Sequence, residues 1–268
     1  MSDTMTKASN FIWYELMTPD PKGAAAFYGA VVGWTIASER DPAAGDMDYR
    51  MIGRSDGGNA GGVLALTPEM EAGGARPFWI GYLHVDGVDA AVDAIKADGG
   101  ALQMPAMDIP VGRIAMVTDP QGAAFYIMDP TPPPGSEGME SDVFSVTEAQ
   151  RVRWNELATS DPEGAIAFYR KHFGWAQEGE MPMGELGAYR FIQRGDVGLG
   201  AVMPLMTGYP APVWNFYIGV DDIDRARAAV AANGGTITNE PMEIPGGEYA
   251  MNAIDPQGAA IGFVGPKK

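Results

Sequence analysis

One block of sequence occurs twice in this chain of 268 residues. The first copy reads Trp13-Tyr14-Glu15-Leu16, Asp20-Pro21, Phe27-Tyr28 and Gly33-Trp34; the second reads Trp154-Asn155-Glu156-Leu157, Asp161-Pro162, Phe168-Tyr169 and Gly174-Trp175. Near the end of each copy, Asp119-Pro120-Gln121-Gly122 returns as Asp255-Pro256-Gln257-Gly258. Two long copies indicate a duplicated domain rather than a solenoid, whose repeats are shorter and more numerous. We predict domains at 8–130 and 150–268, joined by a linker at 131–149.

Composition excludes several classes of partner and site. The formal net charge is −17, so a phosphate backbone would be repelled, and we expect no nucleic acid and no membrane as partner. The chain has no cysteine, which excludes disulfides, thiolate metal ligands and cysteine nucleophiles. Residues 1–10 lack the apolar core of a signal peptide, and no run is long enough to cross a membrane. We expect a soluble cytoplasmic protein.

Each copy shows the order strand, helix, strands, repeated once. Phe11–Met17 is typical of a strand, and Asp20 with Pro21 predicts a helix start. The apolar residues of that helix recur at helical spacing up to Gly33, a predicted C-cap. We predict further strands around 49–52, 62–66 and 78–85, and three more between 102 and 128. Asp86 is the predicted cap of the next helix, and residues 119–122 the predicted hairpin turn.

The segment between the copies, residues 131–138, is rich in proline and glycine and has no periodicity. Its proline run predicts a stiff and extended linker. The whole chain is therefore expected to be α+β, with four βαβββ units in two paired domains.

This order of motifs resembles the vicinal oxygen chelate superfamily, which includes glyoxalase I, bleomycin-resistance proteins and extradiol dioxygenases. The resemblance rests on Ala26-Phe27-Tyr28 before Gly33-Trp34, on Val85-Asp86-Gly87-Val88, on Gly99-Gly100 and on Asp119-Pro120-Gln121-Gly122-Ala123, with their counterparts in the second copy. It implies two tandem glyoxalase-like domains, each with two βαβββ units that form a U-shaped sheet around a cleft.

Metal-dependent members of that family place His, Gln or Glu ligands at four strand positions that face the cleft. The resemblance maps these positions onto residues of other types: Trp13, Ile80 and Tyr126 in the first copy, Trp154, Asn215 and Gly262 in the second, and the surroundings of Ala65 and Pro204. These side chains do not provide the imidazole and carboxylate donors that such metals need. We therefore expect no metal and no other cofactor, which disfavours glyoxalase I and extradiol dioxygenase chemistry.

Strand alternation then predicts which side chains line each cleft. The predicted substrate-binding residues are Trp13, Tyr82, His84, Tyr126 and Arg113 in the first copy, and Trp154, Asn215 and Tyr217 in the second. Such aromatic walls with few polar groups suit a planar or apolar small molecule.

Glu15 and Glu156 are the predicted catalytic residues. A carboxylate among aromatic side chains is desolvated, which disfavours its charged form and suits a general base or a site for a cationic ligand. The competing interpretation is structural: each glutamate pairs with a nearby arginine or tyrosine hydroxyl and helps to join the two domains. His84 has a similar alternative as the partner of Asp86. His172 and the tryptophans Trp34, Trp79, Trp175 and Trp214 are expected to serve packing.

The sequence thus predicts a metal-independent protein that binds an aromatic or apolar metabolite in an aromatic cleft. The alternative is a lyase, isomerase or dioxygenase of the same superfamily that uses Glu15 or Glu156 as base or metal ligand. Whether clefts form within a domain or by exchange between domains stays open at this stage. In the exchanged case, Trp13 and Glu15 would share a cleft with Asn215 and Tyr217. Because the fused copies provide each other's partner, a monomer or weak dimer is expected.

Overall fold

The structure is a computed structural model that describes residues 9–132, 135, 138–207 and 209–268. It contains four βαβββ modules, named A to D in chain order. Module A contains β1 (Phe11–Thr18), α1 (Pro21–Val32), β2 (Thr35–Ile36), β3 (Tyr49–Gly53) and β4 (Asn59–Ala65). Module B contains β5 (Phe78–His84), α3 (Val88–Ala97), β6 (Ala101–Ile109), β7 (Gly112–Thr118) and β8 (Ala124–Pro130), and a short helix, α2 (Pro68–Ala72), precedes it.

The second half repeats this arrangement. Module C contains β9 (Val152–Thr159), α4 (Pro162–Phe173), β10 (Ala176–Pro182), β11 (Ala188–Arg194) and β12 (Val197–Pro204). Module D contains β13 (Val213–Gly219), α5 (Ile223–Ala232), β14 (Thr236–Glu243), β15 (Tyr249–Ile254) and β16 (Ala260–Gly265). The predicted α+β class with four βαβββ units is confirmed.

The strands form two eight-stranded mixed sheets with the same topology. Their orders are β2-β3-β4-β1-β5-β8-β7-β6 and β10-β11-β12-β9-β13-β16-β15-β14. In every module the first strand pairs in parallel with the last, as β1 does with β4, and the last three strands form an antiparallel meander. A parallel pair needs a long crossover connection, which the module's helix and its intervening strands provide.

The modules pack into two compact units that do not follow the halves of the sequence. The first unit comprises the described residues of 1–12, 81–140 and 154–214, and the second comprises 13–80, 141–153 and 215–268. Each unit thus combines a module from each copy: mostly B with C in the first unit, and A with D in the second. The domain boundaries predicted from the sequence stay a prediction.

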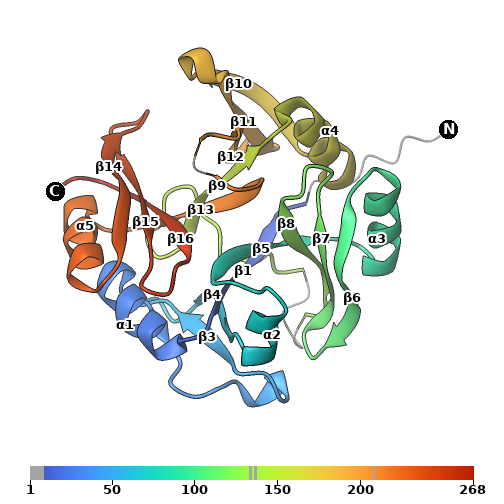
Figure 1. Cartoon of the computed structure of the whole chain (residues 1–268), viewed down its shortest axis with the longest axis horizontal. Helices are drawn as coiled ribbons and strands as arrows, with labels where there is room; N and C mark the ends of the chain where they lie inside the picture. The colour runs from blue at the N-terminus through green and yellow to red at the C-terminus, as the bar shows by residue number, and fades with distance from the viewer. Residues whose placement is uncertain (1–8, 133–134, 136–137, 208) are drawn as a thin grey trace. The chain divides into compact units, whose positions relative to one another are not determined.

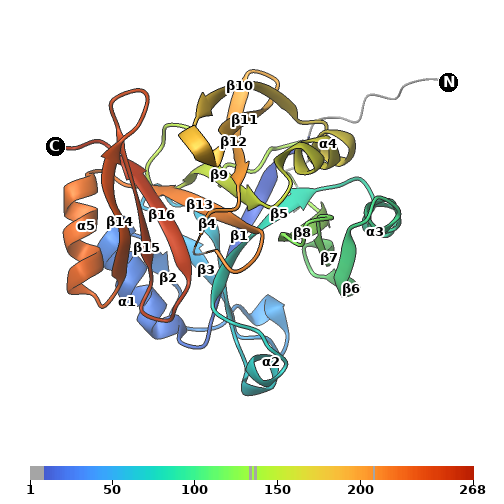
Figure 2. The same cartoon turned by 45° about the horizontal axis from the view of Figure 1, so that its top comes forward.

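In the second unit, helices α1 and α5 lie side by side (Figure 1). Figure 2 shows the same pair from another angle, with α5 along β14, β15 and β16. The Arg225 guanidinium, on α5, donates hydrogen bonds to the carbonyl oxygens of Ala30 and Val31 at 3.0 and 2.8 Å. These carbonyls belong to the last turn of α1, where a cation is favoured by the helix dipole.

Both units contain a buried chain of three polar side chains. In the second unit, the Trp79 indole N–H donates to the Tyr28 hydroxyl at 2.8 Å, and that hydroxyl donates to the Asp255 carboxylate at 3.0 Å. In the first unit, Trp214, Tyr169 and Asp119 form the same chain at 3.0 and 3.2 Å. The predicted packing role of Trp79 and Trp214 is therefore combined with a hydrogen bond that joins modules from the two copies.

Most predicted helix signals hold, and one is wrong. Asp20 accepts a hydrogen bond from the Gly23 backbone N–H, and Gly33 ends α1 in the left-handed conformation at φ 83°. Asp86, however, does not cap α3. The N-cap is instead Gly87, which makes no side-chain hydrogen bond. Its φ of 99° lies in the region that favours glycine, so glycine occupies the turn into the helix.

The predicted linker is only partly a spacer. Residues 133–134 and 136–137, which include most of its proline run, lie outside the described residues, so its stiffness stays a prediction. Further along, Val143 is buried and the carboxylate of Asp142 pairs with Arg54, whose side chain is only 2% exposed. Residues 142–143 are thus part of the packed second unit.

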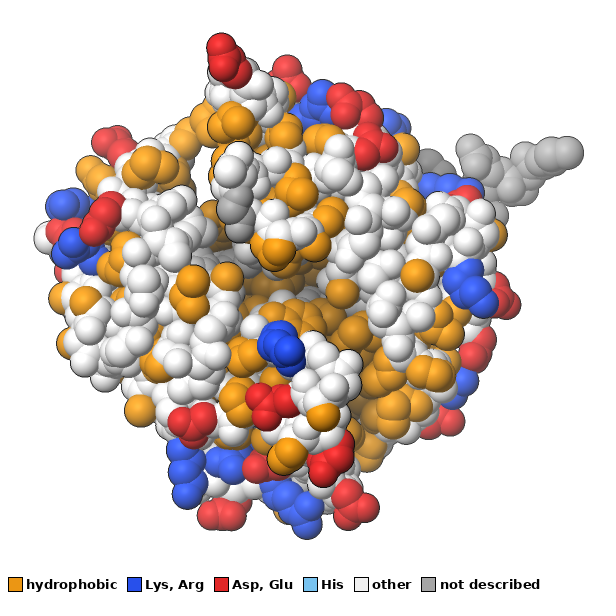
Figure 3. Space-filling model, in the orientation of Figure 1, with side chains coloured by type: hydrophobic (Ala, Val, Ile, Leu, Met, Phe, Trp, Pro, Cys, Tyr) orange, Lys and Arg blue, Asp and Glu red, His pale blue; other side chains and the backbone are white. Residues whose placement is uncertain are grey.

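Charged side chains of both signs lie on the visible face of the molecule. On the face shown in Figure 3, Lys and Arg side chains are interspersed with Asp and Glu rather than gathered into one basic patch. Among the described residues, none of the helices has the length and apolar character that crossing a bilayer requires.

Candidate functional site

The two faces of strand β1 have different roles. Tyr14 packs edge-on against Phe216 of β13, with ring centroids 5.1 Å apart, so this face belongs to the core of the second unit. Trp13 and Glu15 alternate with Tyr14 and therefore lie on the opposite face. Asn215 and Tyr217 likewise lie opposite to Phe216. The contact between modules A and D therefore does not join the Trp13 and Glu15 face to the Asn215 and Tyr217 face, as the exchanged cleft would require.

Trp13, Tyr49 and Glu15 form a cluster on that face of module A. The Trp13 indole N–H donates to the Tyr49 hydroxyl at 2.6 Å. Glu15 pairs with Gly62 of β4, and a Cβ on Gly62 would come within 2.1 Å of the Tyr49 hydroxyl oxygen. The absence of a side chain at Gly62 thus leaves the room in which the tyrosine hydroxyl reaches Trp13, beside the strand position of Glu15.

Module C contains the equivalent cluster, Trp154, Tyr189 and Glu156. The Trp154 indole N–H donates to the Tyr189 hydroxyl at 2.7 Å, and this hydroxyl donates to the Glu156 carboxylate at 2.8 Å. The Phe191 ring adds an aromatic wall, with centroids 6.2 Å from Trp154 and 6.0 Å from Tyr189. The pairing of Glu156 with a tyrosine hydroxyl is therefore observed, within module C.

The members of each cluster differ in their exposure to solvent. Glu15 and Glu156 are only 2% and 6% exposed, whereas the tryptophan and tyrosine of each cluster are half-buried. The aromatic rings of each cluster are thus partly exposed, whereas the carboxylate is almost fully buried. We call the two sets the Trp–Tyr–Glu clusters.

The other predicted substrate-binding residues lie in modules B and D. Tyr82 and Tyr126 stack at a centroid distance of 4.3 Å and are 5% and 4% exposed. Tyr217 accepts a hydrogen bond from the Asn252 amide at 3.0 Å, and Asn215 is buried at 6%. Tyr126 lies on the face of β8 opposite to Phe125, which packs on Tyr169 of α4. Phe125 thus belongs to the face of β8 that packs on α4, and Tyr126 to the opposite face.

His84 and Arg113 have partners within the first unit. His84 Nε2 lies 3.7 Å from Asp86, as its structural alternative predicts. The Arg113 guanidinium forms ion pairs with Asp89 at 2.9 Å and with Asp108 at 2.8 Å. The guanidinium, predicted to bind substrate, is thus engaged by two carboxylates of its own module. His172 Nε2 lies within hydrogen-bond distance of the Asp98 carboxylate, at 2.7 Å, and the ring packs on Phe168.

The residues present do not fit the metal of the resembling enzymes. At the mapped positions the side chains are those of Trp13, Ile80 and Tyr126, and of Trp154, Asn215 and Gly262. Within the described ranges, no group of three or more His, Asp or Glu side chains is placed to hold a metal ion. A zinc or iron site needs such a donor set.

Sequence reasoning missed the tyrosine of each Trp–Tyr–Glu cluster. Tyr49 is the first residue of β3, and Tyr189 is the second residue of β11. Their signal is the repeat itself, because Tyr49-Arg50-Met51-Ile52 returns as Tyr189-Arg190-Phe191-Ile192. A tyrosine that recurs at the same place in both copies, on the same face of the sheet as Trp13, would have identified both residues as candidates.

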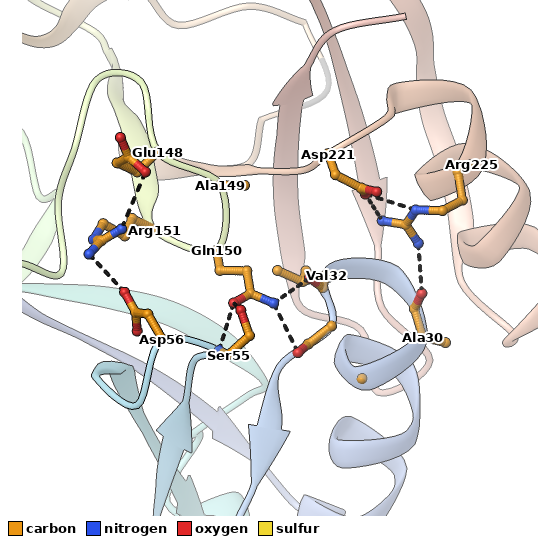
Figure 4. A pocket seen from close by; sticks show the side chains of 12 residues that line it. Ala30, Val32, Ser55, Asp56, Glu148, Ala149, Gln150, Arg151, Asp221 and Arg225 are labelled. Atoms are coloured by element: carbon orange, nitrogen blue, oxygen red, sulfur yellow. Dashed lines mark hydrogen bonds and ion pairs between the residues drawn. The ribbon is translucent and has the colours of Figure 1, made fainter. Parts of the chain in front are cut away.

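A cavity of about 500 Å³ lies elsewhere in the second unit and contains none of the predicted site residues. Figure 4 shows its lining, from the end of α1, the loop before β9 and the start of α5. Gln150 spans it: its amide group donates to Val32 and Gly33 and accepts from Ser55. Gln150 has a φ of 63°, the one positive value at a non-glycine residue in the described part of the chain. The charged lining residues pair with each other, as Arg225 does with Asp221.

Known proteins share both the sequence pattern and the fold. A model of the glyoxalase/bleomycin resistance protein/dioxygenase superfamily matches residues 10–127 and 151–263. The chain is 36% identical to "Putative glyoxylase CFP32" of Mycobacterium bovis over 95% of this chain and 94% of that protein. It is 30% identical to the anthracycline biosynthesis protein DauV of Streptomyces sp. (strain C5) over 94% and 91% of the two chains.

Two solved structures show the same fold at low identity. The Mn(II)-bound glyoxalase from Novosphingobium aromaticivorans superimposes with a TM-score of 0.63 at 14% identity, over 98% of this chain and 83% of that one. The 2,2',3-trihydroxybiphenyl 1,2-dioxygenase from Sphingomonas wittichii gives 0.64 at 13% identity, over 96% and 90%. With both halves matched by the family model, the chain belongs to the glyoxalase/bleomycin resistance protein/dioxygenase superfamily.

Proposed function

We propose that this protein binds a planar aromatic molecule against its Trp–Tyr–Glu clusters without a resident metal ion. The observation that carries the proposal is the duplication of one arrangement: an indole N–H bonded to a phenol oxygen, beside a buried glutamate strand position, in modules A and C. Packing alone needs no polar cluster of the same composition on the same strand face of both copies.

The clusters have the chemistry that such a ligand requires. Half-buried indole and phenol rings offer flat apolar surfaces, on which an aromatic ligand stacks with a gain of about 0.5–1.5 kcal/mol per ring pair beyond area burial. The buried carboxylate fixes orientation, because it accepts a hydrogen bond from a ligand hydroxyl or N–H. A ligand that carries both a flat ring system and such a donor is therefore favoured.

The relatives support this ligand class. Two Streptomyces relatives, DauV and DnrV, are named for anthracycline biosynthesis, and anthracyclines contain a fused planar ring system with hydroxyl groups. Metal independence is supported by the side chains at the mapped ligand positions, which include Trp13 and Trp154 in place of His, Gln or Glu.

The proposal is tested with 1,4-dihydroxyanthraquinone, a flat probe with hydroxyl donors. We expect saturable binding by isothermal titration calorimetry in the presence of EDTA. The double variant Trp13→Ala/Trp154→Ala should lose most of the affinity, and Glu15→Gln/Glu156→Gln should weaken binding about tenfold, the loss of one charge-assisted hydrogen bond. The control variant Tyr249→Phe leaves both clusters intact. Absence of saturable binding to the wild-type protein would refute the proposal.

A second candidate function is proton transfer by Glu156. The observation that favours it is the 2.8 Å hydrogen bond from the Tyr189 hydroxyl to the Glu156 carboxylate, which joins a buried base to a half-buried hydroxyl. A base within hydrogen-bond reach of a bound carbon acid accelerates proton abstraction. Phenylacetone in D₂O provides the test: NMR should show faster exchange of its benzylic protons with wild type than with Glu156→Gln, and equal rates would exclude this function.

A further inference from the structure

Modules B and D carry equivalent rows of side chains that run across their strands. In module B, backbone pairing aligns Tyr82 of β5 with Tyr126 of β8, then with Met116 of β7 and Met104 of β6. In module D, the same pairing aligns Tyr217 of β13 with Gly262 of β16, then with Asn252 of β15 and Asn239 of β14. Directly paired residues project from the same face of a sheet, so each row forms one surface.

The row of module B is aromatic and apolar. The rings of Tyr82 and Tyr126 stack at 4.3 Å with an interplanar angle of 19°. Met116 and Met104 continue the row and are half-buried. A thioether is flexible and polarisable, adapts to an apolar or aromatic ligand, and offers only a weak hydrogen-bond acceptor.

The row of module D has one ring fewer and two amides more. Gly262 replaces the second tyrosine, and a Cβ there would come within 2.3 Å of the Tyr217 ring, so this ring lies over the glycine. The Asn252 amide donates to the Tyr217 hydroxyl at 3.0 Å, and the Asn239 amide donates to the Asn252 carbonyl oxygen at 3.4 Å. The row is thus a chain of polar groups with directional hydrogen bonds.

The outer end of each row is accessible. Asn239 is exposed and Asn252 is half-buried, as are both methionines of module B. An amide provides two N–H donors and a carbonyl acceptor, so Asn239 can bond to a ligand oxygen while it keeps its bond to Asn252. The methionines can only exclude water from an apolar ring.

We propose that the two copies have diverged in ligand class: the module D row selects a planar molecule bearing carbonyl or hydroxyl oxygens, and the module B row selects an unsubstituted apolar ring system. This inference rests on the proposed binding function and specifies the ligand chemistry of each copy. It predicts two sites of unequal preference rather than two identical sites.

A matched pair of probes tests the inference. Naphthalene and 5,8-dihydroxy-1,4-naphthoquinone share a fused two-ring frame and differ in their oxygens. The variant Asn239→Met/Asn252→Met gives the module D row the two methionines of module B and leaves Gly262 in place. We expect it to bind the hydroxyquinone about tenfold more weakly than wild type, the effect of about one lost hydrogen bond, with naphthalene affinity retained or increased.

The reciprocal variant Met104→Asn/Met116→Asn keeps the test decisive if the first variant is unstable. It should strengthen hydroxyquinone binding and weaken naphthalene binding. Unchanged affinities in both folded variants would overturn the inference and leave the proposed function standing, provided that the wild-type protein binds either probe. If the wild-type protein binds neither probe, the inference is overturned, and if 1,4-dihydroxyanthraquinone also fails to bind, the proposed function is overturned with it.

Discussion

At the scale of single residues, the Tyr189 hydroxyl links the tryptophan and the glutamate of the Trp–Tyr–Glu cluster in module C. The Tyr189 oxygen accepts the Trp154 N–H while its own proton is directed to Glu156. A hydroxyl is the side-chain group suited to this place, because it donates and accepts at the same atom. Removing it deprives the indole of an acceptor and the carboxylate of a donor in one step.

The variant Tyr189→Phe is therefore expected to destabilise the protein. Two hydrogen bonds are lost, one of them to a carboxyl group that is 6% exposed, so the free energy of unfolding should fall by about 1–3 kcal/mol. Urea denaturation measures the change. Tyr249→Phe is the matched control: the Tyr249 ring lies 5.6 Å from the Lys267 ammonium, and the substitution keeps that ring. Equal midpoints for the two variants would contradict a structural role for the Tyr189 hydroxyl.

At the scale of elements, the repeated Asp-Pro-Gln-Gly-Ala turn does more than close a hairpin. One oxygen of Asp255 accepts backbone hydrogen bonds from Gln257, Gly258 and Ala259, and the other accepts from Tyr28 of α1. Burial nevertheless raises the pKa of Asp255, and the pKa of Asp119 in the equivalent turn, above the usual aspartate value. In each turn, folding therefore disfavours the ionised form of the aspartate.

The stability of the protein should depend on pH through this turn. Because the folded pKa of Asp255 lies above its ordinary value of 3.8, its stabilising contribution is complete below that value and is lost as the pH rises through the raised pKa. The unfolding free energy of wild type minus that of Asp255→Asn should therefore decrease as the pH rises from about 3.5 to 7. Urea titrations at several pH values measure it, and a flat difference would contradict the raised pKa.

The contact between α3 and α4 provides a dependence of opposite sign. Burial lowers the pKa of His172 although Asp98 opposes the shift, so neutral His172 stabilises the fold above its ordinary pKa of 6.5. This contribution is lost as the pH falls through the lowered pKa. Wild type should thus lose stability relative to His172→Gln between about pH 7 and 5. His84→Gln is the control, because His84 is 37% exposed, and an equal effect there would refute the assignment.

Features that depend on neighbouring residues could be predicted from the sequence, whereas contacts between distant residues could not. Helix α1 was predictable in both ends and in its buried face, because Asp20, Pro21 and Gly33 act within a few residues of their own position. The partners of Arg113 were not, because Asp89 and Asp108 reach it only after β6, β7 and α3 have packed. The hydrogen bond between Trp13 and Tyr49 likewise connects β1 with β3. Strand alternation predicts the face on which a side chain lies, but it does not predict the residue on another strand that the side chain contacts.

At the scale of the whole molecule, duplication keeps the scaffold and permits the surfaces to differ. The buried Trp–Tyr–Asp chain is present in both units with nearly equal distances, because each member satisfies a polar group in the core. The rows of modules B and D, by contrast, differ at three of four positions. The buried polar chain is therefore the same in both copies, whereas the side chains of these two rows differ in chemistry.

We expect no bound metal ion, because the chain shares the fold of metal-dependent enzymes but has other side chains at the ligand positions. The fold is that of enzymes such as the Mn(II)-bound glyoxalase, yet Trp13 and Trp154 stand where the resemblance places a first ligand. Purified protein incubated with Zn²⁺, Ni²⁺, Fe²⁺ or Mn²⁺ and then gel-filtered should retain far less than one ion per chain by inductively coupled plasma mass spectrometry. A metal-dependent glyoxalase treated in parallel is the positive control. Stoichiometric retention would overturn the argument from donor chemistry and make Glu15, Glu156 and His84 the first candidate ligands to replace. Metal-free protein that still binds 1,4-dihydroxyanthraquinone would establish binding without a resident ion.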